Sequence, residues 1–164
     1  MSELHRNGIL TIEGDTATIT FKRRLSYAIE TVWAALTEPE QRAKWFGATT
    51  IDLQTKMIEM TADGPPAPPD KRHVHGRILV WDPPHVLEHE WQQSIVEQST
   101  VRYELTADGA ETILTLIHRG LSVQNAKGFI PGLHAYLDRL EAQLAGADLP
   151  NWMRRYGEVA PAYG

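Results

Sequence analysis

Three side chains capable of acid–base chemistry lie within apolar segments of the chain, namely His89, Tyr103 and His118. Each segment alternates with a period of two, as a half-buried strand does, so residues two apart share a face. The face richest in apolar residues should point into the core, and all three side chains lie on such a face. The residues on these faces are Leu87, His89, Trp91, Val101, Tyr103, Leu105, Leu114, Leu116 and His118.

In a dry pocket, an imidazole and a phenol could carry a cyclase, aromatase or hydrolase reaction by general acid–base catalysis. Burial and neighbouring charges can move the pKa of such groups toward the working pH. The alternative is structural, because a buried histidine usually hydrogen-bonds to a backbone carbonyl. Both interpretations of His89 and His118 stay open at the level of sequence. Trp91 and Tyr103 are interpreted as packing residues that also touch a ligand.

Other chemical signatures are weak or missing from the sequence. His73 and His75 share one strand face, as do His85 and His89, and two imidazoles at this spacing can chelate a metal. No carboxylate or further histidine follows at a ligand spacing, so we predict no metal and no cofactor. The sequence has no cysteine, which excludes disulfides and thiolate chemistry. It also lacks a nucleophile elbow, a phosphate-binding loop and a dinucleotide fingerprint.

The elements that must position these side chains follow from the periodicity. Apolar residues from Ile29 to Leu36 form one helical stripe. Thr37 and Glu40 then have the spacing of a capping box, which predicts a second short helix that ends near Trp45. Four prolines predict a mobile loop over 63–72. Alternating or apolar runs between turn residues predict strands over 9–12, 17–21, 50–61, 73–81, 85–91, 101–105 and 113–119.

A long helix is predicted over 128–144, with Pro131 in its first turn or at a kink and Gly146 as its stop. The tail, 149–164, is expected to pack on the outside. This order predicts an α+β fold in which a curved antiparallel β-sheet wraps around a long C-terminal helix. Two short helices after the first strand would close the open end. We predict a single domain over 1–164, with its core at about 9–146.

Length and charge narrow the range of partners. A chain of 164 residues has the length of one domain. The net charge of −5 argues against a phosphate-binding surface and therefore against nucleic acid as a partner. Residues 1–14 lack the apolar core of a signal peptide, and no apolar run approaches membrane-spanning length. We expect a cytoplasmic protein without membrane insertion, as a monomer or weak homodimer.

Short motifs occur in a characteristic order along the chain: Phe21–Leu25, Val32–Glu40, Trp45–Gly47, His75–Leu79, Asp82–Pro84, Leu87–Trp91, Leu114–Leu121 and Leu133–Leu140. Together they resemble the START-like superfamily, also called SRPBCC or birch-pollen-allergen-like. Within it, the chain is similar to the bacterial single-domain members of the branch named after the activator of the heat-shock-protein-90 ATPase. The chain departs from that branch in having Thr55-Lys56 in place of a Gly-Gly pair, and in a longer proline-rich loop.

The resemblance implies a helix-grip fold with an apolar tunnel between the long helix and the concave sheet. Members of the superfamily bind lipids, hormones, polyketides and other flat apolar molecules, and some are cyclases or aromatases. In this chain Trp45 and Phe46 could gate the tunnel mouth or only anchor the short helices. Both departures from the branch fall at the expected mouth, so the ligand's identity does not follow from the resemblance.

We therefore predict that the protein binds a small hydrophobic or aromatic molecule, such as a lipid, a polyketide or a flavonoid-like compound, in an internal cavity. One alternative is an enzyme of the cyclase or aromatase kind that uses His89, Tyr103 and His118. Another is a module that contacts a chaperone through Arg23-Arg24 or the tail. The predicted ligand-binding residues are Trp45, Phe46, His89, Trp91, Tyr103, Leu116, His118, Leu133 and Leu137, with no catalytic residue assigned.

Overall fold

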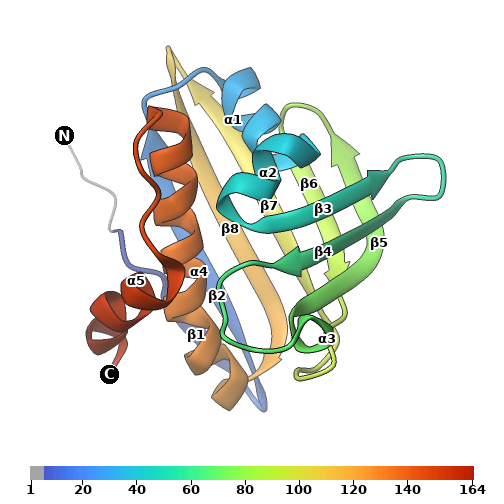
Figure 1. Cartoon of the computed structure of the whole chain (residues 1–164), viewed down its shortest axis with the longest axis vertical. Coiled ribbons are helices and arrows are strands. Elements are labelled where there is room, and N and C mark those ends of the chain that lie inside the picture. The colour runs from blue at the N-terminus through green and yellow to red at the C-terminus, as the bar shows by residue number, and fades with distance from the viewer. Residues whose placement is uncertain (1–5) are drawn as a thin grey trace.

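A computed structural model describes residues 6–164 of the chain. Eight antiparallel strands form one curved sheet in the order β1-β2-β8-β7-β6-β5-β4-β3. The long helix α4 (Val123–Ala145) packs against β1, β2 and β8, while β3, β4 and β5 curl round on the other side (Figure 1). The strands are β1 Ile9–Glu13, β2 Thr16–Leu25, β3 Gly47–Asp52, β4 Met57–Ala62, β5 His73–Asp82, β6 Val86–Trp91, β7 Ser99–Asp108 and β8 Glu111–Ser122.

This architecture confirms the predicted α+β helix-grip fold. We predicted a single domain over residues 1–164, and the first five of these, Met1–His5, lie outside the described residues. The same five residues begin the segment 1–14 that lacks the apolar core of a signal peptide. None of the helices within residues 6–164 combines the length and the apolarity that a bilayer crossing requires.

The inward faces predicted for β6, β7 and β8 are buried. Leu87 pairs with Tyr103 across the sheet, and Tyr103 pairs with Leu116, so these three side chains form one row. His89, Val101 and His118 form the next row in the same way, and both histidines are fully inaccessible to solvent. The alternation of residue types along each strand was therefore sufficient to assign the core face.

Two short helices follow β2, as predicted, and α2 is fixed back onto α1. Helix α1 spans Ile29–Thr37 and α2 spans Pro39–Trp45. The indole Nε1 of Trp45 donates to the carbonyl of Ala35 at 2.8 Å. The predicted capping box is wrong: Glu38 is the N-cap of α2 without a side-chain cap bond, and the Thr37 hydroxyl donates to the Trp33 carbonyl at 2.8 Å. Thr37 thus still belongs to α1, whose last turn it satisfies.

The proline-rich loop after β4 ends in one helical turn, α3 (Pro69–Arg72), which the sequence did not predict. Arg72 holds this loop together, because its Nε donates to the Ala67 carbonyl at 2.7 Å and its Nη1 to the Ala62 carbonyl at 2.5 Å. The loop is therefore shaped by its own arginine, and it closes over the end of β4.

Helix α4 begins five residues earlier than predicted. Strand β8 runs directly into it, and the hydroxyl of Ser122 caps it by accepting from the Asn125 N–H at 3.2 Å. Pro131 consequently lies inside the helix and not in its first turn. The predicted stop is confirmed, since Gly146 adopts the left-handed conformation at φ 68° that ends the helix.

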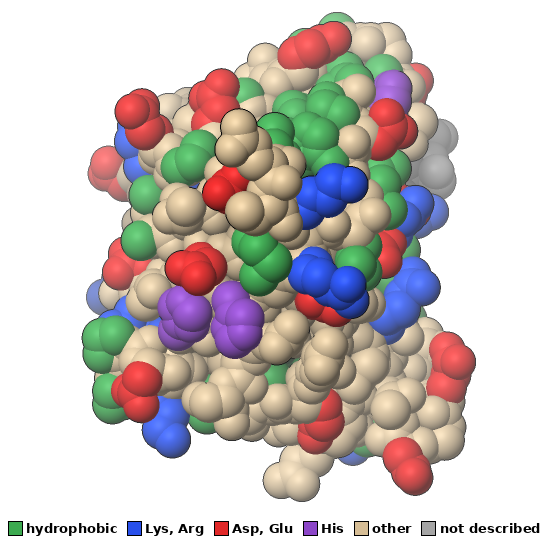
Figure 2. Space-filling model, turned by 90° about the vertical axis from the view of Figure 1, so that its right-hand side faces the viewer, with side chains coloured by type: hydrophobic (Ala, Val, Ile, Leu, Met, Phe, Trp, Pro, Cys, Tyr) green, Lys and Arg blue, Asp and Glu red, His purple; other side chains and the backbone are tan. Residues whose placement is uncertain are grey.

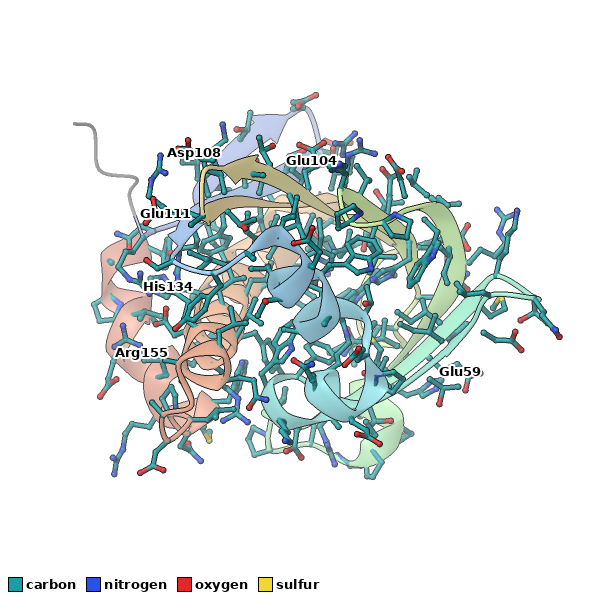
Figure 3. All side chains as sticks on the ribbon, turned by 90° about the horizontal axis from the view of Figure 1, so that it is seen from above. Glu59, Glu104, Asp108, Glu111, His134 and Arg155 are labelled. Carbon is teal, nitrogen blue, oxygen red and sulfur yellow. The ribbon has the colours of Figure 1, made fainter. Side chains whose placement is uncertain are left out.

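The tail forms α5 (Trp152–Val159) and a 3₁₀ turn, η1 (Ala160–Tyr163), and both pack on α4. Asp138 of α4 accepts from Arg23 of β2 at 2.9 Å and from Arg155 of α5 at 2.7 Å. His134 of α4 and Arg155 lie on the same side of the molecule in Figure 3. The tail is thus tied to α4 and to the N-terminal strands by charge as well as by packing.

Candidate ligand-binding pocket

A pocket of about 250 Å³ opens where the N-terminal half of α4 meets α5 and the loops that follow β4 and β6. Together with Phe46 at the end of α2, these make five segments distant in sequence, and most of the side chains there are apolar. The lining residues are Phe46, Ala62, Pro65, Trp91, Gln93, Ile95, Gly128, Phe129, Gly132, Leu133, Tyr136, Trp152 and Tyr156.

Aromatic rings in mutual contact make up most of the wall. The Phe46 ring lies 4.7 Å from Tyr136 and 6.2 Å from Trp91, measured between ring centroids. On the other side, Trp152 lies 5.6 Å from Tyr136 and 5.2 Å from Tyr156. Ring faces and edges in this arrangement stabilise each other and offer flat surfaces to a flat apolar molecule.

Helix α5 is held against the pocket by two hydrogen bonds to carbonyls of α4. Trp152 Nε1 donates to the Gly132 carbonyl at 3.1 Å, and the Tyr156 hydroxyl donates to the Gly128 carbonyl at 2.8 Å. Glycine is needed on both sides of the indole. A Cβ placed on Gly64 would lie 2.4 Å from Trp152 Cγ, and one on Gly132 would lie 3.0 Å from Trp152 Cζ2.

Few of the lining residues carry polar groups, and those of Gln93 are hydrogen-bonded within the protein. Gln93 accepts from Trp91 Nε1 at 2.9 Å and donates to the Lys71 carbonyl at 2.9 Å. Burial raises the pKa of Tyr136, so its phenol is neutral. The buried Tyr136 hydroxyl makes no hydrogen bond of normal geometry within residues 6–164. The site is therefore an apolar recess without a charged lining residue.

The structure places three of the nine predicted binding residues in the pocket wall: Phe46, Trp91 and Leu133. The other six are buried in the core behind or beside it. Trp45 is held by Ala35, and Leu116 and Leu137 are each 2% exposed where α4 meets the sheet. The remaining three are the groups singled out for chemistry, namely His89, Tyr103 and His118.

Neither histidine is a lining residue, although both lie next to the lining residue Trp91. The Trp91 ring is 6.4 Å from that of His89 and 5.1 Å from that of His118. His89 Nδ1 donates to the Glu90 carbonyl at 2.8 Å, so its Nε2 is the unprotonated nitrogen, and this nitrogen has no partner within residues 6–164. Burial, with a smaller effect of Arg42, lowers the pKa of His89 to about 4.

His118 is in a similar state. Its Nε2 lies 2.9 Å from the Ser99 hydroxyl, and burial lowers its pKa to about 3, with His89 contributing less. Tyr103 is buried and its hydroxyl faces Arg42 Nη2 at 3.5 Å. None of the three groups proposed for acid–base catalysis lines the pocket, so the geometry does not aim them at a molecule bound there.

The other residues considered from the sequence lie elsewhere. The rings of His73 and His75 stack at 5.6 Å on β5. Across the part of the chain that the structure describes, no three His, Asp or Glu side chains are arranged to hold a metal. The face on the β5 side carries acidic and basic side chains interspersed (Figure 2). Arg23, suggested as a chaperone contact, is 2% exposed inside the Asp138 cluster.

The pocket residues that the sequence did not reveal come from α4, α5 and the two loops: Phe129, Tyr136, Trp152, Tyr156, Gln93 and Ile95. The aromatic pair at 152 and 156 has the i, i+4 spacing of one helix face. That spacing was the available signal that the tail presents a surface to the rest of the protein.

Solved structures share this fold over nearly the whole chain. CalU16 from Micromonospora echinospora has a TM-score of 0.76 and 25% identity, covering 96% of this chain and 94% of its own. The protein encoded by gene BPP1335 from Bordetella parapertussis has a TM-score of 0.70 and 26% identity, covering 93% and 86%. EF2215 from Enterococcus faecalis, a conserved protein of unknown function, has a TM-score of 0.73 and 15% identity, covering 95% and 87%.

A comparison with curated proteins finds no match. A family model described as activator of Hsp90 ATPase homolog 1-like protein matches residues 26–145, from the start of the short helices to the end of α4. The match covers the motifs from Val32 to Leu140 that carry the resemblance in the sequence. The chain belongs to this Hsp90-ATPase-activator-like family of the START-like superfamily.

Proposed function

We propose that the pocket between α4 and α5 binds a small, flat hydrophobic or aromatic molecule, and that binding is the protein's activity. The observation that carries this proposal is the wall of contacting aromatic rings around about 250 Å³ of space. Small-molecule sites are concave and mostly apolar, with few polar groups. The family is one whose fold commonly holds hydrophobic ligands, which is consistent with the proposal.

The volume limits the size of the ligand. A cavity of about 150 Å³ in another protein holds benzene, so this pocket has room for roughly ten to fifteen non-hydrogen atoms. A molecule with two fused rings fits this range better than a long-chain lipid or a three-ring flavonoid. Among the ligand classes expected from the sequence, small aromatic compounds are therefore preferred.

Glycine positions in the two helices offer a matched pair of variants for the test. Gly128 lines the pocket, and a Cβ there would meet nothing within 4 Å, so we expect Gly128→Leu to be tolerated and to take up space at the recess. Gly157 of α5 also has open space around its Cβ and does not line the pocket. Gly157→Leu is thus the same substitution in a neighbouring helix.

The experiment is a thermal-shift and calorimetric titration with a panel of one- to three-ring aromatics and medium-chain lipids. A ligand that binds the native state raises the melting temperature. We expect two-ring compounds to bind the wild type and Gly157→Leu equally, and Gly128→Leu at least tenfold more weakly. A panel without any shift, or equal binding to Gly128→Leu, would refute the proposal.

A further inference from the structure

Arg42 of α2 is a fully buried cation beside the pocket. Its Nη1 donates to the Leu36 carbonyl at 2.9 Å, and its Nη2 contacts Met60 Sδ at 3.1 Å and the Tyr103 hydroxyl at 3.5 Å. Its Nε has no hydrogen-bond partner within residues 6–164. The protein thus leaves one of the guanidinium donors unsatisfied in an environment where water does not reach it.

No carboxylate in the described residues balances this charge. The ion pairs of residues 6–164 do not include Arg42. By contrast, the buried guanidinium of Arg23, which is 2% exposed, forms ion pairs with both Asp138 and Glu141. A buried charge without a counter-charge is costly. Aromatic rings offset only part of this cost.

Those rings connect Arg42 to the pocket. The guanidinium carbon lies 5.0 Å from the centroid of Phe46, 5.2 Å from Trp45 and 5.6 Å from Tyr103. Phe46 is itself a pocket-lining residue, so its ring is the partition between the buried cation and the empty space. The positive charge of Arg42 helps to lower the pKa of His89, so its effect extends beyond its own contacts.

We propose that the ligand of this pocket is an anion, an aromatic carboxylic acid whose carboxylate lies toward Phe46 and balances the charge of Arg42. This inference rests on the proposed function, because it names the chemical class of the molecule that the pocket takes. The attraction acts through the low-dielectric interior, where a charge interacts far more strongly than in water. It therefore does not require a direct hydrogen bond between the carboxylate and the guanidinium.

Three naphthalene derivatives that differ in one substituent test the proposal: 2-naphthoate, 2-naphthalenemethanol and 2-naphthylmethylamine. Calorimetry at pH 7.5 should show 2-naphthoate binding at least about tenfold more tightly than the alcohol, and the amine more weakly than the alcohol. Equal affinities for acid and alcohol, or a preference for the alcohol or the amine, would overturn the inference and leave the proposed function standing. Failure of all three to bind would overturn this inference, whereas the proposed function falls only if the wider panel of aromatics and lipids also gives no shift.

Variants identify the source of the preference. Arg42→Gln keeps a polar side chain and removes the charge, so the acid and alcohol should then bind within about twofold of each other. Arg42→Lys keeps the charge and should keep the preference. Arg24→Gln, the same change at an exposed arginine of β2, should leave both affinities unchanged. A preference for the acid that survives in Arg42→Gln would show that Arg42 is not its source. If this variant does not fold, the three affinities of the wild type still test whether the pocket prefers an anion.

Discussion

The close packing of Trp152 in the tail against Gly64 predicts how much a methyl group added at Gly64 should destabilise the protein. A Cβ added at Gly64 would lie 2.4 Å from Trp152 Cγ and 2.5 Å from Cδ2, which is more than 1 Å inside ordinary contact. A shift of the indole away from Gly64 would strain or break the hydrogen bond from its Nε1 to the Gly132 carbonyl at 3.1 Å. Gly64→Ala should therefore push the loop or α5 out of place.

Overpacking of this kind costs about 1 to 3 kcal/mol of unfolding free energy. For a chain of this size each 1 kcal/mol lowers the melting temperature by about 2–4 °C. The three nearest atoms are Cβ, Cγ and Cδ2 of Trp152, so in a Trp152→Gly background, which lacks all three, the second change, Gly64→Ala, should cost less than about 0.5 kcal/mol. The two substitutions are thus predicted to couple by at least about 0.5 kcal/mol.

The assay is a double-mutant cycle by urea unfolding, supported by thermal melts. Gly128→Ala is the control, since its Cβ meets nothing within 4 Å and alanine favours a helix by up to about 1 kcal/mol over glycine. Purely additive costs of Gly64→Ala and Trp152→Gly would show that Trp152 does not pack against the loop at Gly64, and that this contact does not hold α5 in the pocket wall.

Two further predictions concern stability. Because burial lowers the pKa of His89 to about 4 and of His118 to about 3, the unfolded chain takes up protons below pH 6.5 that the folded chain does not. As the pH falls from 6.5 to about 4, the unfolding free energy should fall by about 1.4 kcal/mol per pH unit for each of these histidines. An unfolding free energy that stays constant between pH 7 and 5 in urea titrations would contradict their burial as neutral groups. Asp138→Asn should lower the unfolding free energy by about 2–3 kcal/mol in the same assay, because it leaves the buried Arg23 with Glu141 alone and releases Arg155. A decrease in unfolding free energy below about 0.5 kcal/mol would show that these ion pairs contribute little to stability.

Local patterns in the sequence predicted most of the fold, because strands and helices of this domain carry their own periodicity. The stripe from Ile29 to Leu36 became α1, and the alternation around His89, Tyr103 and His118 assigned the buried faces of three strands. The start of α4 was missed because β8 passes into it without a turn, so Ser122 is both the last strand residue and the helix cap.

The pocket was only partly predictable. Phe46, Trp91 and Leu133 were found from motifs and helical spacing, but Trp152 and Tyr156 enter the wall by docking of the tail onto α4. That docking depends on the small size of Gly64 and Gly132, which are far from the tail in sequence. No local periodicity encodes such a contact. The unpaired charge of Arg42 is likewise invisible in sequence, since its surroundings are set by β4 and β7.

We expect a ligand to lie in the pocket between α4 and α5, and not in a tunnel deeper between α4 and the sheet. The most direct test is an isotope-filtered NMR experiment on the wild type with saturating 2-naphthalenemethanol, which measures contacts from the bound rings to protein methyl groups. A ligand in this pocket should give contacts to the methyls of Leu133 and Ile95, which line it. Contacts to Leu116 and Leu137 without contacts to Leu133 and Ile95 would contradict it.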